Sequence, residues 1–529
     1  MIAFRVDTQC GLGHFMRMKW LAVALEGRGA KTVFFVDENT TVGEFIAPLQ
    51  AKIVWVPKFQ SCREDAEFCL SYLDAQAMNI QWFVLDGYGF DVTWEDKAQQ
   101  QGIQLMSMDD LGREHHADLV VDMKWAGKDT HSRYESLVAP GTDCLLGPEF
   151  AILAPEYQVN ESLEQRADTI TFSLGGGGDW TQLTEVIEQL CHCSEQTCNI
   201  LAVIGPKALN TEKLRQIESQ FDNLVLVDAP KSLASIYRKT GLFVGALGTS
   251  LYELAVTKTP ALTFSLAVNQ HNEIENLQDL GHYYHVPDLL DYPVSTVSKL
   301  IFTLFEHRST IAAQRRHPSV HVDGLGRERI ADILLGTPVK QRKQLQSEPS
   351  NGVEVVSELS DSLHVRKVTN NDVNGYLQAR NRAENMWRMT ITDTIKEIDH
   401  YVWWFNNNRH SYVLEKDSKP LIYVWHQVYR EDQQDYLFGG WFAASNDVNF
   451  VHAQLILKWQ LEYCAAQHSE AVWLAVINKD NKFVNLLNQK EGFVTLTPES
   501  QEFSVTQRLF PQASEDEFNY VAKFPASRA

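Results

Sequence analysis

A histidine follows two glycines near the start of the chain, in the segment Asp7-Thr8-Gln9-Cys10-Gly11-Leu12-Gly13-His14-Phe15-Met16-Arg17. An apolar run typical of a strand ends at Asp7, and helical spacing begins beside His14. Glycine lets a backbone approach a ligand closely, and the first N–H groups of a helix are free to bind one. Because imidazole titrates near neutral pH, the segment predicts His14 as a general base. A histidine that only hydrogen-bonds at a helix start is the alternative.

Four glycines, Gly175–Gly178, separate a predicted strand ending at Leu174 from a predicted helix starting at Trp180. Backbone N–H groups in such a loop can hold a pyrophosphate. A flexible linker has a similar composition, but it is not expected between a strand and a helix of one domain.

A third segment, Gly248-Thr249-Ser250-Leu251-Tyr252-Glu253, also follows a predicted strand. A hydroxyl at a helix start with a carboxylate three residues later is typical of a capping box. The functional alternative places Ser250 on a phosphate and Glu253 on ribose hydroxyls.

Alternating strands and helices position these segments throughout the first 335 residues. The predicted strands are Ile2–Val6, Lys31–Val36, Ile53–Val56, Trp82–Leu85, Ile103–Met108, Leu119–Val121, Thr169–Leu174, Ile200–Ile204, Leu224–Val227, Leu242–Val244 and Ala261–Ser265. Such alternation indicates an α/β fold with two doubly wound parallel sheets, hinged near Gly147-Pro148-Glu149. Ligands bind at the carboxyl ends of such strands, so we expect the site in the cleft between the two domains.

The pattern changes after residue 335. Residues 336–362 have the composition of a linker, and a differently organised region follows. Its predicted helices are Asp372–Asn385, Ile395–Asn406, Asn449–Ala466 and Asn481–Lys490, and its predicted strands are Ser411–Glu415, Leu421–His426, Tyr436–Ala443 and Ala471–Ile477. The predicted domains are therefore 1–147, 148–335 and 363–529.

Composition narrows the class of protein. The chain has 529 residues and a formal net charge of −21, which argues against nucleic acid as a partner. No stretch approaches the ~20 apolar residues of a membrane span, and the start does not read as an export signal. We therefore expect a cytoplasmic protein without membrane insertion. The spacing of Cys191, His192, Cys193 and Cys198 matches no standard zinc pattern, so no metal is expected.

In order and spacing, the motifs of residues 1–330 resemble the UDP-sugar hydrolase of pseudaminic acid biosynthesis (PseG type) and, more distantly, the MurG-like GT-B glycosyltransferases. The resemblance rests on Phe4-Arg5-x-Asp7, Gly11-x-Gly13-His14-x-x-Arg17, Asp86-Gly87-Tyr88-Gly89, Met108-Asp109-Asp110, His115-His116-Ala117-Asp118, Gly147-Pro148-x-Phe150-Ala151-Ile152-Leu153, the glycine loop, Ser250-Leu251-x-x-Glu253 and Asn269-Gln270.

This resemblance implies hydrolysis of UDP-2,4-diacetamido-2,4,6-trideoxy-β-L-altrose to UDP and the free sugar. His14 would activate the water that attacks the anomeric carbon, with Tyr88 and Asn269 beside the sugar. The substrate-binding residues that it implies are Gly11, Gly13, Arg17, Asp86, Gly175, Gly176, Gly177, Ser250, Glu253 and Gln270. No cofactor is expected for the hydrolase, and other enzymes of the same sugar pathway are the expected protein partners.

The last third resembles a GNAT acyltransferase of the sugar N-acetyltransferase (PseH) type. The resemblance rests on Val476-Ile477-Asn478-Lys479-Asp480-Asn481, Glu491-Gly492-Phe493, Arg380-Asn381 and Trp403–Asn406. It implies acetyl-CoA as a cofactor, but the stretch that would hold the coenzyme pyrophosphate, 445–453, has no glycine. Asn488 stands where the family commonly has a tyrosine that protonates the CoA thiolate. We therefore expect a GNAT-like domain that is degenerate in activity.

The tryptophans of this region, Trp387, Trp403, Trp404, Trp425, Trp441 and Trp459, admit two interpretations. One is packing within a small α+β domain, and the other is a sugar-stacking surface. For the whole chain the leading hypothesis is a UDP-sugar hydrolase. The alternatives are a bifunctional hydrolase and N-acetyltransferase, a GT-B glycosyltransferase, and a non-catalytic nucleotide-sugar or glycan-binding protein.

Overall fold

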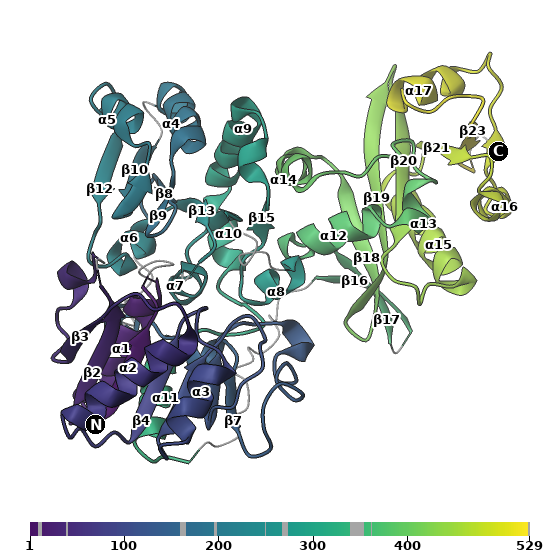
Figure 1. Cartoon of the computed structure of the whole chain (residues 1–529). Helices are drawn as coiled ribbons and strands as arrows, with labels where there is room; N and C mark the ends of the chain where they lie inside the picture. The colour runs from purple at the N-terminus through teal and green to yellow at the C-terminus, as the bar shows by residue number, and fades with distance from the viewer. Residues whose placement is uncertain are drawn as a thin grey trace. The chain divides into compact units, whose positions relative to one another are not determined.

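The computed structural model describes residues 1–8, 13–38, 41–158, 166–194, 198–248, 250–266, 273–338, 354–360 and 362–526. The chain divides into two units, Met1–Pro349 and Ser350–Ala529 (Figure 1). Among the described residues, none of the helices combines the length and the apolar composition that a bilayer crossing requires.

The first unit contains the two doubly wound parallel sheets that the sequence predicts. The N-terminal sheet has the strand order β3-β2-β1-β4-β5-β6-β7. Its strands are β1 (Ile2–Val6), β2 (Thr32–Asp37), β3 (Lys52–Val56), β4 (Trp82–Asp86), β5 (Gln104–Met108), β6 (Leu119–Asp122) and β7 (Asp143–Leu146). Strand β7 is short and was not predicted.

Helices cover both faces of this sheet because successive strand residues point to opposite sides. Phe4 packs in the cluster that contains α1 (Gly13–Glu26), and Ala3 packs in the cluster that contains α2 (Cys62–Ala75) and α3 (Val92–Gln99). Both faces are buried, so the strands are apolar almost throughout.

Helix α11 (Gly326–Leu334) packs on this sheet although it lies at the end of the region 148–335, which the sequence assigns to the second domain. Ile330, Ala331 and Leu334 are fully buried in the same cluster as α1. The domain boundary is therefore corrected: apolar spacing identifies a helix but does not say which of two sheets it covers.

The second sheet has the order β12-β10-β8-β13-β14-β15. Its strands are β8 (Thr169–Ser173), β10 (Asn199–Ile204), β12 (Leu224–Asp228), β13 (Leu242–Ala246), β14 (Ala261–Phe264) and β15 (Tyr284–His285). The helices of this half are α4 (Thr181–Ser194), α5 (Glu212–Glu218), α6 (Ala234–Lys239), α7 (Ser250–Thr257), α8 (Ile274–Asp279), α9 (Val294–Glu306) and α10 (Arg308–Gln314).

The glycine loop differs from the prediction. The second half of the loop, Gly177 and Gly178, belongs to strand β9 (Gly177–Asp179), which pairs with β11 (Lys207–Leu209) in a separate two-stranded sheet. The Asp179 side chain accepts a hydrogen bond from the backbone N–H of Thr181, at the start of α4, at 2.8 Å. The protein itself therefore satisfies this N–H group at the start of α4.

The second unit is an α+β structure around a sheet of order β16-β17-β18-β19-β20-β21-β23-β22. Its strands are β16 (Val355–Ser360), β17 (Leu363–Lys367), β18 (His410–Lys416), β19 (Lys419–Glu431), β20 (Gln434–Ala443), β21 (Val472–Asn478), β22 (Val494–Thr495) and β23 (Phe518–Lys523). Its helices are α12 (Val373–Arg380), α13 (Ala383–Met386), α14 (Glu397–Asn406), α15 (Phe450–Gln467), α16 (Lys482–Lys490) and α17 (Gln501–Leu509). Neighbouring strands are antiparallel except β20 and β21, which are parallel.

Two predictions for this region are wrong. The predicted linker 336–362 includes strand β16, which forms a hairpin with β17 and is held where Trp459 Nε1 donates to Ser357 Oγ at 2.8 Å. The predicted helix Asp372–Asn385 is interrupted after α12, where the Asn381 side-chain oxygen accepts from the N–H of Ile395 at 3.0 Å. Asparagine side chains compete in this way with helical hydrogen bonds, which propensity alone does not reveal.

Candidate active site

Both sheets of the first unit reverse their winding direction at one point, between β1 and β4 in the first and between β8 and β13 in the second. Ligands of open α/β sheets bind at such switch points, outside the carboxyl ends of the strands. His14 follows β1 and Tyr88 follows β4, while the glycine loop follows β8 and Ser250 follows β13. The tertiary fold thus places the segments that the sequence singled out at switch points.

His14 lies on a buried ion pair at the first switch point. Its Nδ1 is 2.7 Å from Asp86 Oδ1 at the end of β4. The Arg17 guanidinium, one helical turn beyond His14, donates from Nε to Asp86 Oδ2 at 2.5 Å and from a terminal nitrogen to Asp86 Oδ1. Residues three apart lie on the same side of a helix, which is why His14 and Arg17 reach one carboxylate.

The charge of Asp86 fixes the tautomer of His14. Burial opposes ionisation of Asp86, but the charges of Arg17 and His14 outweigh it and lower the pKa of the carboxyl below its ordinary value. An ionised carboxylate only accepts hydrogen bonds. The proton between the two groups therefore belongs to His14 Nδ1, which leaves Nε2 as the basic nitrogen.

Tyr88 packs edge-on against the His14 ring, with the ring centroids 5.0 Å apart. Its hydroxyl donates to Asp110 Oδ2 at 3.2 Å. The sequence predicts Tyr88 at the sugar, and the structure places it beside His14. Asp86 is fully buried, so it positions His14 and Arg17 and does not face a ligand as predicted.

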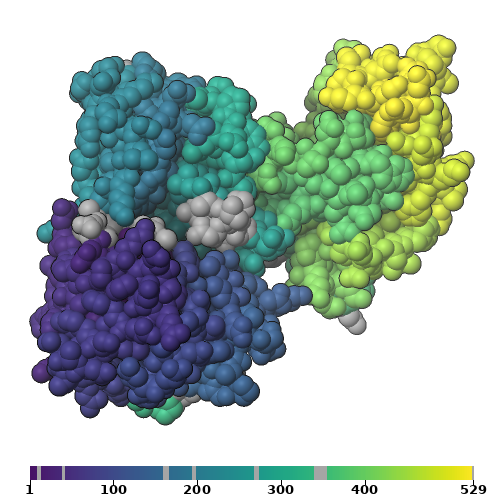
Figure 2. Space-filling view, viewed as in Figure 1, coloured from purple at the N-terminus to yellow at the C-terminus, as the bar shows by residue number. Residues whose placement is uncertain are grey.

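A cavity of about 340 Å³ lies between the two lobes that the sheets of the first unit build (purple to blue and teal in Figure 2). The predicted residues that line it are Gly13, Arg17, Gly175, Gly176, Ser250 and Glu253. Gly177 does not line it, because it belongs to β9. His14 and Tyr88 are not among the residues that line it, although Gly13 and Arg17, on either side of His14 in sequence, are. Gly11, Asn269 and Gln270 fall outside the described residues.

Two loops meet closely at the floor of the cavity. A Cβ on Gly205, after β10, would lie 2.2 Å from the carbonyl oxygen of Gly175. No side chain can occupy that position, so the glycine at 205 lets the loops after β8 and β10 come together. Gly175 itself has φ +76°, whereas a Cβ on Gly176 would meet no atom within 4 Å. Backbone N–H groups of this floor are the candidate phosphate ligands.

Glu253 lies on the second-sheet side of the cavity, on α7. Burial raises the pKa of its carboxyl to about 7, although a hydrogen bond with Tyr157 acts in the opposite direction. Ser250, at the start of α7, donates its hydroxyl hydrogen to the carbonyl of Ala246 at 3.1 Å. The carboxylate therefore suits hydroxyl groups of a ligand more directly than the serine suits a phosphate.

Other cavity residues were not predicted. Tyr157 and Lys231 line it, and Lys231 is an exposed residue whose side chain carries a positive charge. Lys231 lies in Asp228-Ala229-Pro230-Lys231-Ser232 directly after β12, so its position after a parallel strand could have identified it from the sequence. Tyr157 lies in a 3₁₀ turn outside both sheets, and no periodicity points to it.

No protein-family profile matches the chain. The sequence is 20% identical over 287 residues to the UDP-2,4-diacetamido-2,4,6-trideoxy-beta-L-altropyranose hydrolase of Campylobacter jejuni, a match covering 53% of this chain and 97% of that protein.

Solved structures similar to this chain include Acinetobacter baumannii MurG, which is 13% identical with a TM-score of 0.44 and a match covering 64% of this chain and 99% of that one. Another is the UDP-GlcNAc 2-epimerase of Neisseria meningitidis bound to UDP-GlcNAc, which is 11% identical with a TM-score of 0.45 and a match covering 64% and 100%. The first unit itself consists of two doubly wound parallel sheets.

Proposed function

We propose that the first unit hydrolyses a UDP-linked sugar to UDP and the free sugar. The observation that carries the proposal is the His14–Asp86–Arg17 arrangement beside a glycine-floored cavity between the two sheets. We further propose 2,4-diacetamido-2,4,6-trideoxy-L-altrose as the sugar. The distant likeness to the Campylobacter jejuni hydrolase supports this choice.

His14 acts as the general base in this reaction. His14 Nδ1 carries a hydrogen that it donates to Asp86, so Nε2 is the nitrogen that removes a proton from water as the water oxygen attacks the anomeric carbon. The bond between that carbon and the UDP oxygen breaks, and UDP leaves with the bonding electrons. Attack opposite the leaving group inverts the anomeric centre.

The glycine floor stabilises the leaving UDP. Negative charge grows on the pyrophosphate as the bond breaks, and backbone N–H groups with the Lys231 ammonium meet that charge. Glu253, on the same side of the cavity, accepts hydrogen bonds from the ribose hydroxyls. Arg17 has a different part, because it keeps Asp86 ionised and so holds His14 in the basic tautomer.

Hydrolysis of the UDP-diacetamido-trideoxy sugar in ¹⁸O-labelled water tests the proposal. Mass spectrometry should find one labelled oxygen in the free sugar and none in UDP. Label in UDP would instead mean attack at phosphorus. If the substrate stays unchanged in water and reacts only after a sugar or lipid acceptor is added, the protein is a glycosyltransferase.

A further inference from the structure

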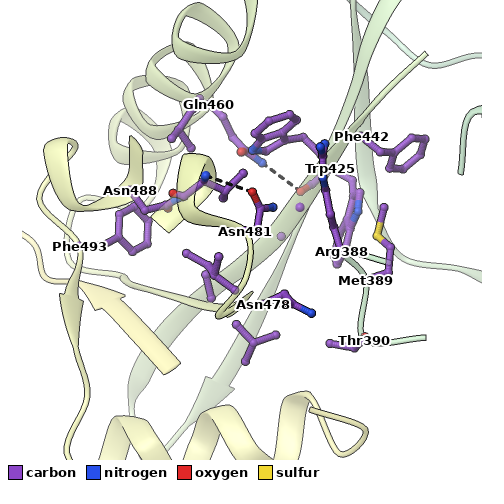
Figure 3. A pocket seen from close by; sticks show the side chains of 18 of the residues that line it. Arg388, Met389, Thr390, Trp425, Phe442, Gln460, Asn478, Asn481, Asn488 and Phe493 are labelled. Carbon is purple, nitrogen blue, oxygen red and sulfur yellow. Dashed lines mark hydrogen bonds between the residues drawn. The ribbon is translucent and has the colours of Figure 1, made fainter. Parts of the chain in front are cut away.

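The second unit contains a pocket of about 170 Å³ where the parallel strands β20 and β21 separate (Figure 3). The strands pair only over Tyr436–Phe438 and Val472–Leu474. Beyond those residues β20 continues beside β19 and β21 beside β23, so the edges that face each other have no partner strand. Such edges present peptide N–H and C=O groups, which suit the planar amide of a ligand.

The side chains around the pocket are aromatic or carry neutral amides. Aromatic rings come from Trp425, Trp441, Phe442, Trp473, Phe493 and Phe510, and amides come from Asn385, Gln460, Asn478, Asn481 and Asn488. Indole rings pack against the C–H face of a sugar. Asn385 uses its amide on the backbone of Ala379 and Ala443, whereas Gln460, Asn481 and Asn488 each use one end of the amide on the backbone, so the other end can meet a ligand hydroxyl. This combination suits a neutral ligand with hydroxyl and amide groups.

Acyl transfer to an amine needs a base for the ammonium and an acid for the departing thiolate. Among the described residues lining the pocket there is no Asp, Glu, His, Lys, Cys or Tyr. Arg388 is the charged side chain among the described lining residues (Figure 3), and its guanidinium lies 4.9 Å from the Trp387 ring centroid. Arginine stays protonated at physiological pH, so it supplies no base.

The start of α15 is poorly suited to a coenzyme pyrophosphate. The Asn449 side chain accepts from the N–H of His452 at 3.1 Å, and His452 Nδ1 accepts from the N–H of Asn449 at 3.3 Å. Phe450 and Val451 occupy the first turn with 50% and 57% of their surfaces exposed. The helix therefore caps itself, and apolar side chains stand where phosphate would need polar neighbours.

We propose that the pocket between β20 and β21 binds an N-acylated pyranose without transferring its acyl group. The acetamido amide enters between the two strand edges, and the ring packs against Trp441. The choice of an acetamido sugar rests on the function proposed for the first unit. The ligand is either the free sugar or the sugar still attached to UDP. In the UDP-linked sugar, a phosphate contacts the Arg388 guanidinium.

Isothermal titration of the full-length protein tests this binding, with N-acetylglucosamine, glucosamine, the free 2,4-diacetamido-trideoxy sugar, UDP-N-acetylglucosamine and acetyl-CoA as probes. UDP is added throughout in excess, so that the cavity of the first unit stays occupied. We expect at least one acetamido sugar to bind, glucosamine to bind much more weakly, and acetyl-CoA not to bind.

Trp441→Leu should weaken sugar binding about tenfold, since a stacked aromatic surface is lost. Trp55→Leu, at a 42% exposed tryptophan of the first unit, is the matched control and should leave affinity unchanged. Ala475→Leu narrows the pocket without removing a ring, so it replaces Trp441→Leu if that variant misfolds. Arg388→Gln should leave the free sugar unaffected and weaken a UDP-linked one.

Acetyl-CoA binding that Trp441→Leu abolishes would overturn the proposal in favour of an acyltransferase pocket. Failure of every acetamido sugar to bind, or equal affinities of wild type, Trp441→Leu and Ala475→Leu, would also overturn it. Hydrolysis by the first unit is measured separately, so loss of either proposal is recognised without the other.

Discussion

The two ring nitrogens of His14 have different neighbours, and this difference makes the residue testable. Nδ1 is held by Asp86, so removal of the imidazole should affect proton transfer and not nucleotide binding. We expect His14→Ala to lower kcat about 10²- to 10⁴-fold, the usual contribution of a general base. UDP affinity, measured by titration calorimetry, should stay close to that of wild type.

His131→Ala, at an exposed histidine of the same lobe, is the control and should retain full activity. If His14→Ala kept a rate within a few-fold of wild type, His14 would not be the base. A large loss of UDP affinity in that variant would instead indicate a binding role.

Because the pKa of the Glu253 carboxyl is raised, we expect UDP binding to depend on pH. Burial raises the pKa of its carboxyl from 4.5 to about 7, so the group is largely protonated in the folded protein at pH 6 and ionised at pH 8. An ionised carboxylate accepts from ribose hydroxyls more strongly. UDP affinity should therefore rise as pH rises through 7, and Glu253→Gln should remove that rise, whereas Glu156→Gln, at an exposed neighbour, should not.

The raised pKa of Glu253 also predicts that the free energy of unfolding falls as pH rises. Between pH 4.5 and about 7 the folded state binds more protons at Glu253 than the unfolded state does, so this group lowers the free energy of unfolding as pH rises. Denaturant melts of wild type and Glu253→Gln across that range should diverge, with the variant showing the smaller decline. Parallel curves would mean that solvent in the cavity restores the ordinary pKa.

At the scale of the elements, the close approach of two loops predicts opposite results at two glycines of the cavity. A Cβ on Gly205 would meet the backbone of Gly175 and Gly176, whereas a Cβ on Gly176 meets nothing within 4 Å. Gly205→Ala should therefore displace the floor and weaken UDP binding about tenfold or more, equivalent to at least ~1.4 kcal/mol. Gly176→Ala should bind UDP much as wild type does, and equal losses in both variants would show that loop spacing is not what matters.

Helix α11 predicts a stability difference between two adjacent leucines. Leu334 is fully buried against the first sheet, and Leu335 is 39% exposed. Leu334→Ala should lower the free energy of unfolding by about 3 kcal/mol through lost burial and a residual cavity. Leu335→Ala should change it by less than about 0.5 kcal/mol, as surface substitutions usually do. Similar values for both in urea melts would contradict the packing of α11 on α1.

At the scale of the molecule, each unit has its own hydrophobic clusters, which predicts separate responses to ligands. Differential scanning calorimetry should resolve two transitions. UDP at 100 times its Kd should stabilise the transition of the first unit by about 2.7 kcal/mol and leave the other unchanged. An acetamido sugar in the presence of UDP should shift the second transition. A single transition that both ligands move would contradict independent units.

The sequence by itself determined most of the parallel strands of the first unit and six residues that line its cavity: Gly13, Arg17, Gly175, Gly176, Ser250 and Glu253. Short apolar runs between helical segments identify parallel strands because both faces of such a sheet are buried. Gly13, Gly175 and Ser250 could be chosen without a structure because they follow such strands, and the carboxyl ends of parallel strands share one edge of the sheet.

Only the tertiary structure decided which partner each group meets. The pairing of His14 with Asp86 joins residues 72 positions apart, and helical spacing gives no sign of it. Packing on the first sheet rather than the second decided the place of α11, and pairing with β11 turned Gly177 away from the cavity. The local sequence shows which side of a segment is apolar, but the residues against which that side packs are distant in sequence.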